Sequence, residues 1–166
     1  MPSEFSFDAV SEVDLNLVNE SIAVAMKEIG NRYDFKDSNA SLELNEKDKK
    51  ITVRAKAEMQ VEAAVDVLFQ RLAKRNIPLK NFKRGEKIEQ ALGQTARLEV
   101  AIQSGIPVDK AKKMIAALKE SKIKVNASIQ SDQLRVSSKS KDELQQAMAL
   151  LRSGNFEVEV QFKNFR

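Results

Sequence analysis

The stretch Asn39-Ala40-Ser41 returns further along the chain as Asn126-Ala127-Ser128. After each copy, two short segments of alternating apolar and polar residues lead into an amphipathic helix. A shift of 83 positions aligns similar residues, as in the pairs Ile51 with Leu134, Val53 with Val136, Lys56 with Lys139, Val61 with Leu144, Ala64 with Ala147 and Leu68 with Leu151. A repeat of this size indicates a duplicated supersecondary unit, so the sequence predicts two copies of one small domain.

In both halves of the chain, apolar residues recur with the periods of strands or helices. The elements that they predict follow the same order in each half. The first half predicts a strand, a helix, a hairpin, a helix and a weaker strand, at residues 5–13, 14–30, 41–55, 61–76 and 82–88. The second half predicts the same order at residues 96–102, 107–118, 123–136, 140–153 and 158–162. Asp14 and Pro107 are expected to begin helices, and Ser140 forms a capping box with Glu143.

The order β-α-β-β-α-β, present twice, is that of the ferredoxin-like fold. The predicted fold class is therefore α+β, with two tandem ferredoxin-like (RNP-like) domains at residues 1–91 and 92–166. Each domain is expected to hold a four-stranded antiparallel sheet with two helices on one face. The sequence leaves open whether the first strand completes the sheet of the other half, an exchange that would interleave the domains.

The composition argues against catalysis. The chain has no His and no Cys, which excludes serine–histidine triads, thiol nucleophiles and ordinary zinc sites. No tight acidic cluster stands out for Mg²⁺, so we expect a protein that is not an enzyme and needs no cofactor. The lack of Cys, of a long apolar run and of a signal peptide favours the cytoplasm and no membrane partner. An excess of 28 basic over 24 acidic residues permits an anionic partner without requiring one.

The open sheet faces are expected to be polar. In the second half the outward positions are net basic and include Arg135, but they carry no aromatic residue on which a base could stack. A polar face of this kind is explained equally well as a solvated surface or as a packing surface between the domains, without any ligand. The start of the helix at Pro107, followed by Lys112 and Lys113, could attract an anion, but an ordinary helix start is favoured.

Two segments mix aromatic and cationic residues beyond what core patterning requires. They are Asn31-Arg32-Tyr33-Asp34-Phe35-Lys36 and the C-terminal Gln161-Phe162-Lys163-Asn164-Phe165-Arg166. A ring that stacks on a base beside a cation that meets phosphate suits a nucleotide. Core aromatics flanked by surface charges explain the spacing equally well.

The chain resembles the YajQ family of small bacterial proteins. The resemblance is carried by Phe7 to Asp14, Arg32 to Lys36, Asn39-Ala40, Lys112-Lys113, Lys119 to Val125, Arg135-Val136, Lys139 to Gln145 and Gln161 to Arg166. It implies two tandem ferredoxin-like domains and a role in binding nucleotides or nucleic acid, with cyclic di-GMP as the ligand in some members. Ser131 and Ser138 depart from the family by standing where Gly is common. Lys141 stands where Arg is common, which removes bidentate phosphate geometry there.

The leading interpretation is a non-enzymatic protein that binds a nucleotide, a cyclic dinucleotide such as cyclic di-GMP, or RNA. An adaptor that binds a regulatory protein partner through its sheet faces is the alternative, and a carboxylate–Mg²⁺ enzyme is a third hypothesis. The candidate nucleotide-binding residues are Arg32, Tyr33, Phe35, Lys36, Lys112, Lys113, Arg135, Lys139, Lys163, Asn164, Phe165 and Arg166. The two aromatic–cation segments are further expected to meet in one composite site at the domain junction.

Overall fold

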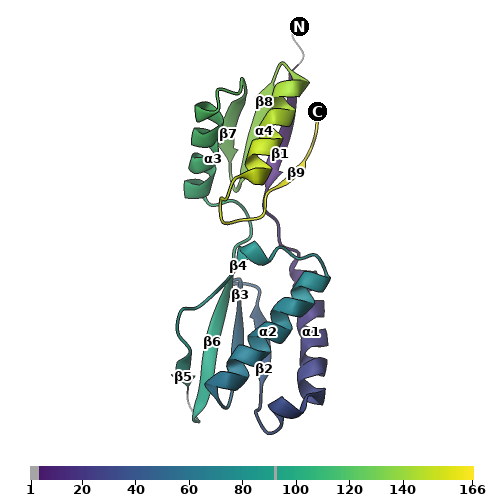
Figure 1. Ribbon diagram of the computed structural model, residues 1–166, viewed down its shortest axis with the longest axis vertical. Helices are drawn as coiled ribbons and strands as arrows, with labels where there is room; N and C mark the ends of the chain where they lie inside the picture. The colour runs from purple at the N-terminus through teal and green to yellow at the C-terminus, as the bar shows by residue number, and fades with distance from the viewer. Residues whose placement is uncertain (1–3, 92) are drawn as a thin grey trace. The chain divides into compact units, whose positions relative to one another are not determined.

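The computed structural model describes residues 4–91 and 93–166 and separates into two compact units (Figure 1). One unit, here the middle unit, comprises Val13–Gln103. The other, here the terminal unit, joins the N-terminal segment through Glu12 with Ser104–Arg166. The described residues form four α-helices and two antiparallel sheets, which confirms the α+β class. No helix in the described part of the chain is long and apolar enough to cross a membrane.

The middle unit packs two long helices on a sheet of order β2-β3-β6-β4, with β5 pairing to β6. Its helices are α1 (Leu15–Asn31), α2 (Glu58–Lys74) and the 3₁₀ helices η1 (Tyr33–Phe35) and η2 (Leu79–Asn81). Its strands are β2 (Ser41–Asn45), β3 (Lys50–Ala55), β4 (Phe82–Arg84), β5 (Glu89–Ala91) and β6 (Thr95–Ile102). The strand expected over 82–88 is shorter than predicted, since β4 covers only Phe82–Arg84, and the short strand β5 follows beyond that range.

Local sequence explains where α1 begins. The Asp14 side chain accepts hydrogen bonds from the backbone N–H groups of Asn16 and Leu17, so it satisfies two donors that the helix leaves free. The helix continues through Gly30, which was expected to end it, and stops at Asn31. The core between helices and sheet consists of fully buried apolar residues of α1, α2, β3 and β6: Val18, Ile51, Val53, Val61, Leu68, Leu72, Leu98 and Val100.

The terminal unit carries two helices on a sheet of order β7-β8-β1-β9. Its elements are β1 (Phe5–Val10), α3 (Val108–Glu120), β7 (Asn126–Gln130), β8 (Gln133–Ser138), α4 (Lys141–Ser153) and β9 (Gln161–Lys163). Its core is built on Phe7, Ala9, Met114, Leu134, Val136, Ala147 and Leu151, none of which is exposed. Residues that alternate with these core positions, such as Asp8 and Arg135, lie on the opposite face of the sheet, here the open face.

The units do not follow the halves of the sequence. Strand β1 pairs with β8 and β9, and β6 pairs with β3, so each joins strands of the other half. The boundary predicted after residue 91 therefore lies inside the middle unit. The physical reason is the close connection between β5 and β6: Ala91 stands opposite Thr95, and this hairpin register keeps β6 beside its sequence neighbours. The terminal sheet is then completed by β1.

Candidate functional site

Asp8 of β1 organises a polar cluster on the open face of the terminal unit. In the strand register it stands between Arg135 of β8 and Lys163 of β9. Its Oδ1 accepts a hydrogen bond from Arg135 Nε at 3.0 Å, and its Oδ2 accepts one from Asn164 Nδ2 at 2.7 Å. The Arg135 hydrogen bond is the main reason that the pKa of Asp8 lies below its ordinary value, although burial opposes the shift. Asp8 is only 3% exposed, so the bonded carboxylate is a fixed part of the sheet.

The C-terminal segment is held against β1 beyond the end of β9. Ser6 and Arg166 exchange two backbone hydrogen bonds, of 3.2 and 3.0 Å. Since Asp8 is paired with Lys163, the single residue Phe7 stands opposite both Asn164 and Phe165. This two-against-one pairing is a β-bulge, and Asn164 adopts the left-handed conformation there, with φ of 58°.

A small apolar hollow lies beside this bulge, with a volume of about 170 Å³. Phe5 of β1, Leu144 and Met148 of α4, and Phe165 line it, and Ser6, Lys141, Gln145 and Arg166 complete its wall. Phe165 is 62% exposed, and its ring centre lies 6.4 Å from that of the buried Phe7. The Lys141 ammonium lies 4.9 Å from the centre of the Phe5 ring, which is a cation–π contact.

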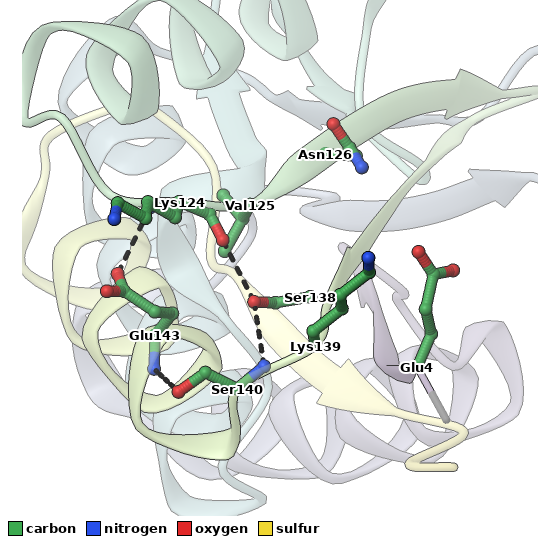
Figure 2. A pocket seen from close by; sticks show the side chains of 8 residues that line it. All are labelled: Glu4, Lys124, Val125, Asn126, Ser138, Lys139, Ser140 and Glu143. Carbon is green, nitrogen blue, oxygen red and sulfur yellow. Dashed lines mark hydrogen bonds between the residues drawn. The ribbon is translucent and has the colours of Figure 1, made fainter. Parts of the chain in front are cut away.

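A wider groove of about 570 Å³ opens at the start of α4 (Figure 2). Its floor is a hydrogen-bonded chain in which Ser138 Oγ donates to the Lys124 carbonyl at 2.9 Å and accepts from Ser140 N–H at 3.1 Å. Ser140 Oγ in turn accepts from Glu143 N–H at 3.4 Å. The Glu143 carboxylate accepts from the Lys124 backbone N–H at 3.1 Å, so the predicted capping box forms only its first half.

The charges around this groove balance. Lys124 and Lys139 supply two cations, and Glu4 and Glu143 supply two carboxylates. Lys139, one of the predicted site residues, is exposed at the edge of this groove. A neutral polar groove offers hydrogen bonds without a strong attraction for phosphate.

The segment after α1 lies in the middle unit and lines a depression of about 570 Å³. Arg32 forms a two-pronged ion pair with Asp34, with Nε–Oδ1 and Nη2–Oδ2 distances of 3.0 and 2.7 Å. This pair lowers the pKa of Asp34 and raises that of Arg32. Phe35 is buried in the core beneath the Arg32 guanidinium, whereas Tyr33 is 87% exposed and Lys36 is also exposed.

The lysines of α3 stand apart from these features. Lys112 and Lys113 are exposed on the helix surface and line none of the three depressions described above. The backbone N–H of Gly105 donates to the Ser11 carbonyl, and that of Ile106 donates to the Asp132 carbonyl at 2.8 Å. These two amides precede the first turn of α3 and already have partners in the protein, so they do not add to the donors that the helix itself leaves free.

The structure thus gathers Arg135, Lys163, Asn164, Phe165 and Arg166 in the terminal unit, and Arg32, Tyr33, Phe35 and Lys36 in the middle unit. Whether these two groups meet in one composite site stays a prediction. Sequence reasoning did not select Asp8, Phe5 or Lys141. Asp8 did give a signal, because a carboxylate within the apolar run Phe7 to Val10 needs a partner when buried. Among the described residues, no three Asp or Glu side chains gather in a way that could hold a metal ion.

Comparison with known proteins finds a family that matches nearly the whole chain. The family model described as nucleotide-binding protein YajQ-like matches residues 5–166. The chain belongs to the YajQ family. A relative from Elusimicrobium minutum is 57% identical over 164 residues, which cover 99% of both chains. Relatives from Carboxydothermus hydrogenoformans and Bacillus cereus are 48% and 43% identical over the full length of both chains. All three relatives are named nucleotide-binding proteins.

Proposed function

We propose that this chain is a non-enzymatic nucleotide-binding protein of the cytoplasm. The observation that carries the proposal is that five expected site residues lie in the terminal unit on β8, on β9 and on the tail that follows β9. Arg135, Lys163 and Asn164 surround Asp8, and Phe165 and Arg166 line the hollow beside the bulge. They come from two strands and a bulged tail, and together they offer cations, an amide and an exposed ring. The names of the family relatives give the same class of ligand independent support.

The chemistry of the cluster suits binding. Arg135 is half-exposed, and Asp8 holds its guanidinium in place, so its remaining N–H groups are oriented before a phosphate arrives. Lys163 pairs with Glu12 at 2.5 Å in an exposed contact, which an incoming phosphate can exchange at small cost. Asn164 donates one amide hydrogen to Asp8 and retains a carbonyl oxygen that could accept from a base.

The finer assignments belong to this proposal. The ligand class includes mononucleotides, cyclic dinucleotides such as cyclic di-GMP, and RNA. Arg32, Tyr33 and Lys36 would serve a contact in the middle unit. The strand order β7-β8-β1-β9 supports a ferredoxin-like terminal unit, since β1 and β8 occupy the centre of the sheet and the last strand lies beside the first.

Titration calorimetry of the full chain against nucleotides, cyclic dinucleotides and short RNAs tests the function. Binding should weaken steeply as salt rises, because phosphate contacts release counterions. Arg166→Ala should reduce affinity by about tenfold or more, as expected for a lost charge-assisted contact of about 1.5–3 kcal/mol. Lys119→Ala, which removes an exposed cation of α3 in the same unit, is the matched control and should bind normally. The absence of binding across the panel would contradict the proposal.

A further inference from the structure

Three hollows in the described residues differ in charge. The groove at the start of α4 is balanced, with two lysines and two glutamates. The depression after α1 is lined by the cations Arg32 and Lys36 and by the carboxylate of Asp37. Arg32 is already paired with Asp34. In the apolar hollow beside the bulge, by contrast, the described lining residues include two cations, Lys141 and Arg166, and no carboxylate side chain. Of these three hollows, this one combines an apolar interior with two cationic side chains.

The interior of the apolar hollow is lined by aromatic and aliphatic side chains. Phe5 and Phe165 supply aromatic surface, and Leu144 and Met148 of α4 close the side. Its volume of about 170 Å³ is much smaller than the 570 Å³ of either wider depression, which favours one base over a stacked pair. Base–aromatic stacking tolerates every base, because each has a π-face.

The β-bulge explains why Phe165 is here. Along a regular strand, side chains alternate between the two faces, so the residue two positions after Lys163 would return to the open face. The extra residue moves Asn164 next to Asp8 on the open face and turns Phe165 towards the buried ring of Phe7. A ring packed on one side and 62% exposed presents a surface that the core does not use. Bulges commonly re-aim a side chain next to a functional site.

The cations stand at the rim. Lys141 lies over the Phe5 ring at 4.9 Å, and Arg166 is fixed through its backbone to Ser6. A phosphate attached to a nucleoside whose base enters the hollow would lie at this rim, where both cations can reach it. Lys141 is the first residue of α4 and Arg166 lies on the tail after β9, and both are exposed.

We propose that the hollow between Phe5 and Phe165 binds the base of one nucleotide unit, with its phosphate held by Lys141 and Arg166. The proposal rests on the proposed nucleotide-binding function and specifies where and in what form the ligand is recognised. The unit can come from a free nucleoside monophosphate or from a splayed-out nucleotide of a single strand. A cyclic dinucleotide whose two bases stack together does not fit a single-base hollow.

The test uses 2-aminopurine riboside 5′-monophosphate, a fluorescent base analogue that is quenched by stacking. The chain has no Trp and one Tyr, so its own fluorescence interferes little. Phe165→Ala should weaken binding of this probe by about 5- to 150-fold, which corresponds to the loss of one stacked aromatic. Phe165→Tyr should retain binding of the probe, because the aromatic ring is kept. Val108→Ala, at another exposed apolar residue of the same unit, should leave binding unchanged. Melting temperatures of all variants establish that they are folded.

A second comparison isolates the phosphate. Lys141→Ala and Arg166→Ala should each weaken the monophosphate probe but leave the uncharged 2-aminopurine riboside almost unaffected, and Lys141→Arg should retain binding. Competition with adenosine monophosphate, oligoadenylate RNA, oligodeoxyadenylate and cyclic di-GMP distinguishes the sources of the nucleotide unit. If cyclic di-GMP displaced the probe and the other three competitors did not, the proposal that the hollow binds the base of one nucleotide unit would be wrong.

The two proposals fail in different ways. If the probe binds but Phe165→Ala has no effect, or if only Tyr33→Ala weakens it, the hollow is not the base site and nucleotide binding itself stands. If neither the probe nor any competitor binds, nucleotide binding is wrong as well. Equal losses for riboside and monophosphate in Lys141→Ala would show that this lysine shapes the hollow and does not hold phosphate.

Discussion

The Asp8 carboxylate accepts a 2.7 Å hydrogen bond from Asn164, which lies 156 residues further along the chain. This contact links the first strand to the tail that follows the last one, and Arg135 completes it from the neighbouring strand. A buried carboxylate is costly unless it is paired and hydrogen-bonded, and both conditions are met here. The same contact fixes the bulged tail on which Phe165 and Arg166 stand.

Asp8→Asn should destabilise the protein by about 1.5–3 kcal/mol, the usual contribution of hydrogen bonds to a charged group. The amide is nearly isosteric, so the loss reflects the missing charge opposite Arg135. Chemical denaturation measures the change. Glu12→Gln, which removes the exposed pair with Lys163, is the control and should cost no more than about 1 kcal/mol. Equal effects of the two substitutions would show that burial of Asp8 gives it no special role.

The difference between the wild type and Asp8→Asn should depend on pH. The folded state lowers the pKa of Asp8, so the ionised form stabilises the fold. That contribution is complete above the ordinary pKa of about 3.9 and is lost as the pH falls through the lower value of the folded state. Denaturation at a series of pH values should therefore show the two proteins converging in stability in acid. A constant difference down to the acid limit would contradict the assigned ion pair.

Gly105→Ala should destabilise the terminal unit by about 1–3 kcal/mol. Gly105 has φ of +92°, and an added Cβ would lie 2.6 Å from Asp132 Oδ2 and 2.7 Å from Asp132 Cβ. Gly30→Ala is the opposite case, because Gly30 lies within α1 and an added Cβ meets nothing within 4 Å. It should stabilise the middle unit by about 0.4–1 kcal/mol. Thermal unfolding measures the change in stability of each variant. The prediction fails if both substitutions change stability in the same direction.

Arg32→Ala and Asp34→Asn should change nucleotide affinity in opposite directions. If Arg32 contacts phosphate, its loss should cost about 1.5–3 kcal/mol of binding. Asp34 competes for the same guanidinium through two hydrogen bonds, so neutralising it should strengthen binding. Calorimetry with the tightest ligand of the nucleotide panel measures both, and Lys124→Ala should have little effect. A loss in both variants would show that the ion pair itself, and not a free guanidinium, shapes the segment.

The fragment 13–103 should fold on its own, and the fragment 1–91 should not. The first contains every strand of the middle sheet. The second lacks β6, which lies between β3 and β4, and it keeps β1 without its partners β8 and β9. Circular dichroism and amide dispersion in NMR spectra distinguish the two results. A cooperative unfolding transition in fragment 1–91 would place the true boundary where the sequence halves meet.

Much of the architecture could be predicted from the sequence because it depends on local chemistry. The period of apolar residues places β3 and β8 correctly, and the repeat aligns Ile51 with Leu134, both of which are fully buried. Asp14, Pro107 and Ser140 begin their helices as expected, since a cap depends on a few neighbouring residues. The aromatic–cation composition of the tail was also visible in the chain itself.

Tertiary structure alone decided which sheet each strand joins and how the tail is used. An alternating strand such as β1 can bury its apolar face in either sheet, because the period of two fixes the face and not the partner. Its pairing with β8 and β9 brings Asp8 to Arg135 and Asn164 across more than a hundred residues. The bulge opposite Phe7 depends on that pairing, and it turns Phe165 into the apolar hollow. Such long-range register is a property of the packed sheet, which no local pattern of residues specifies.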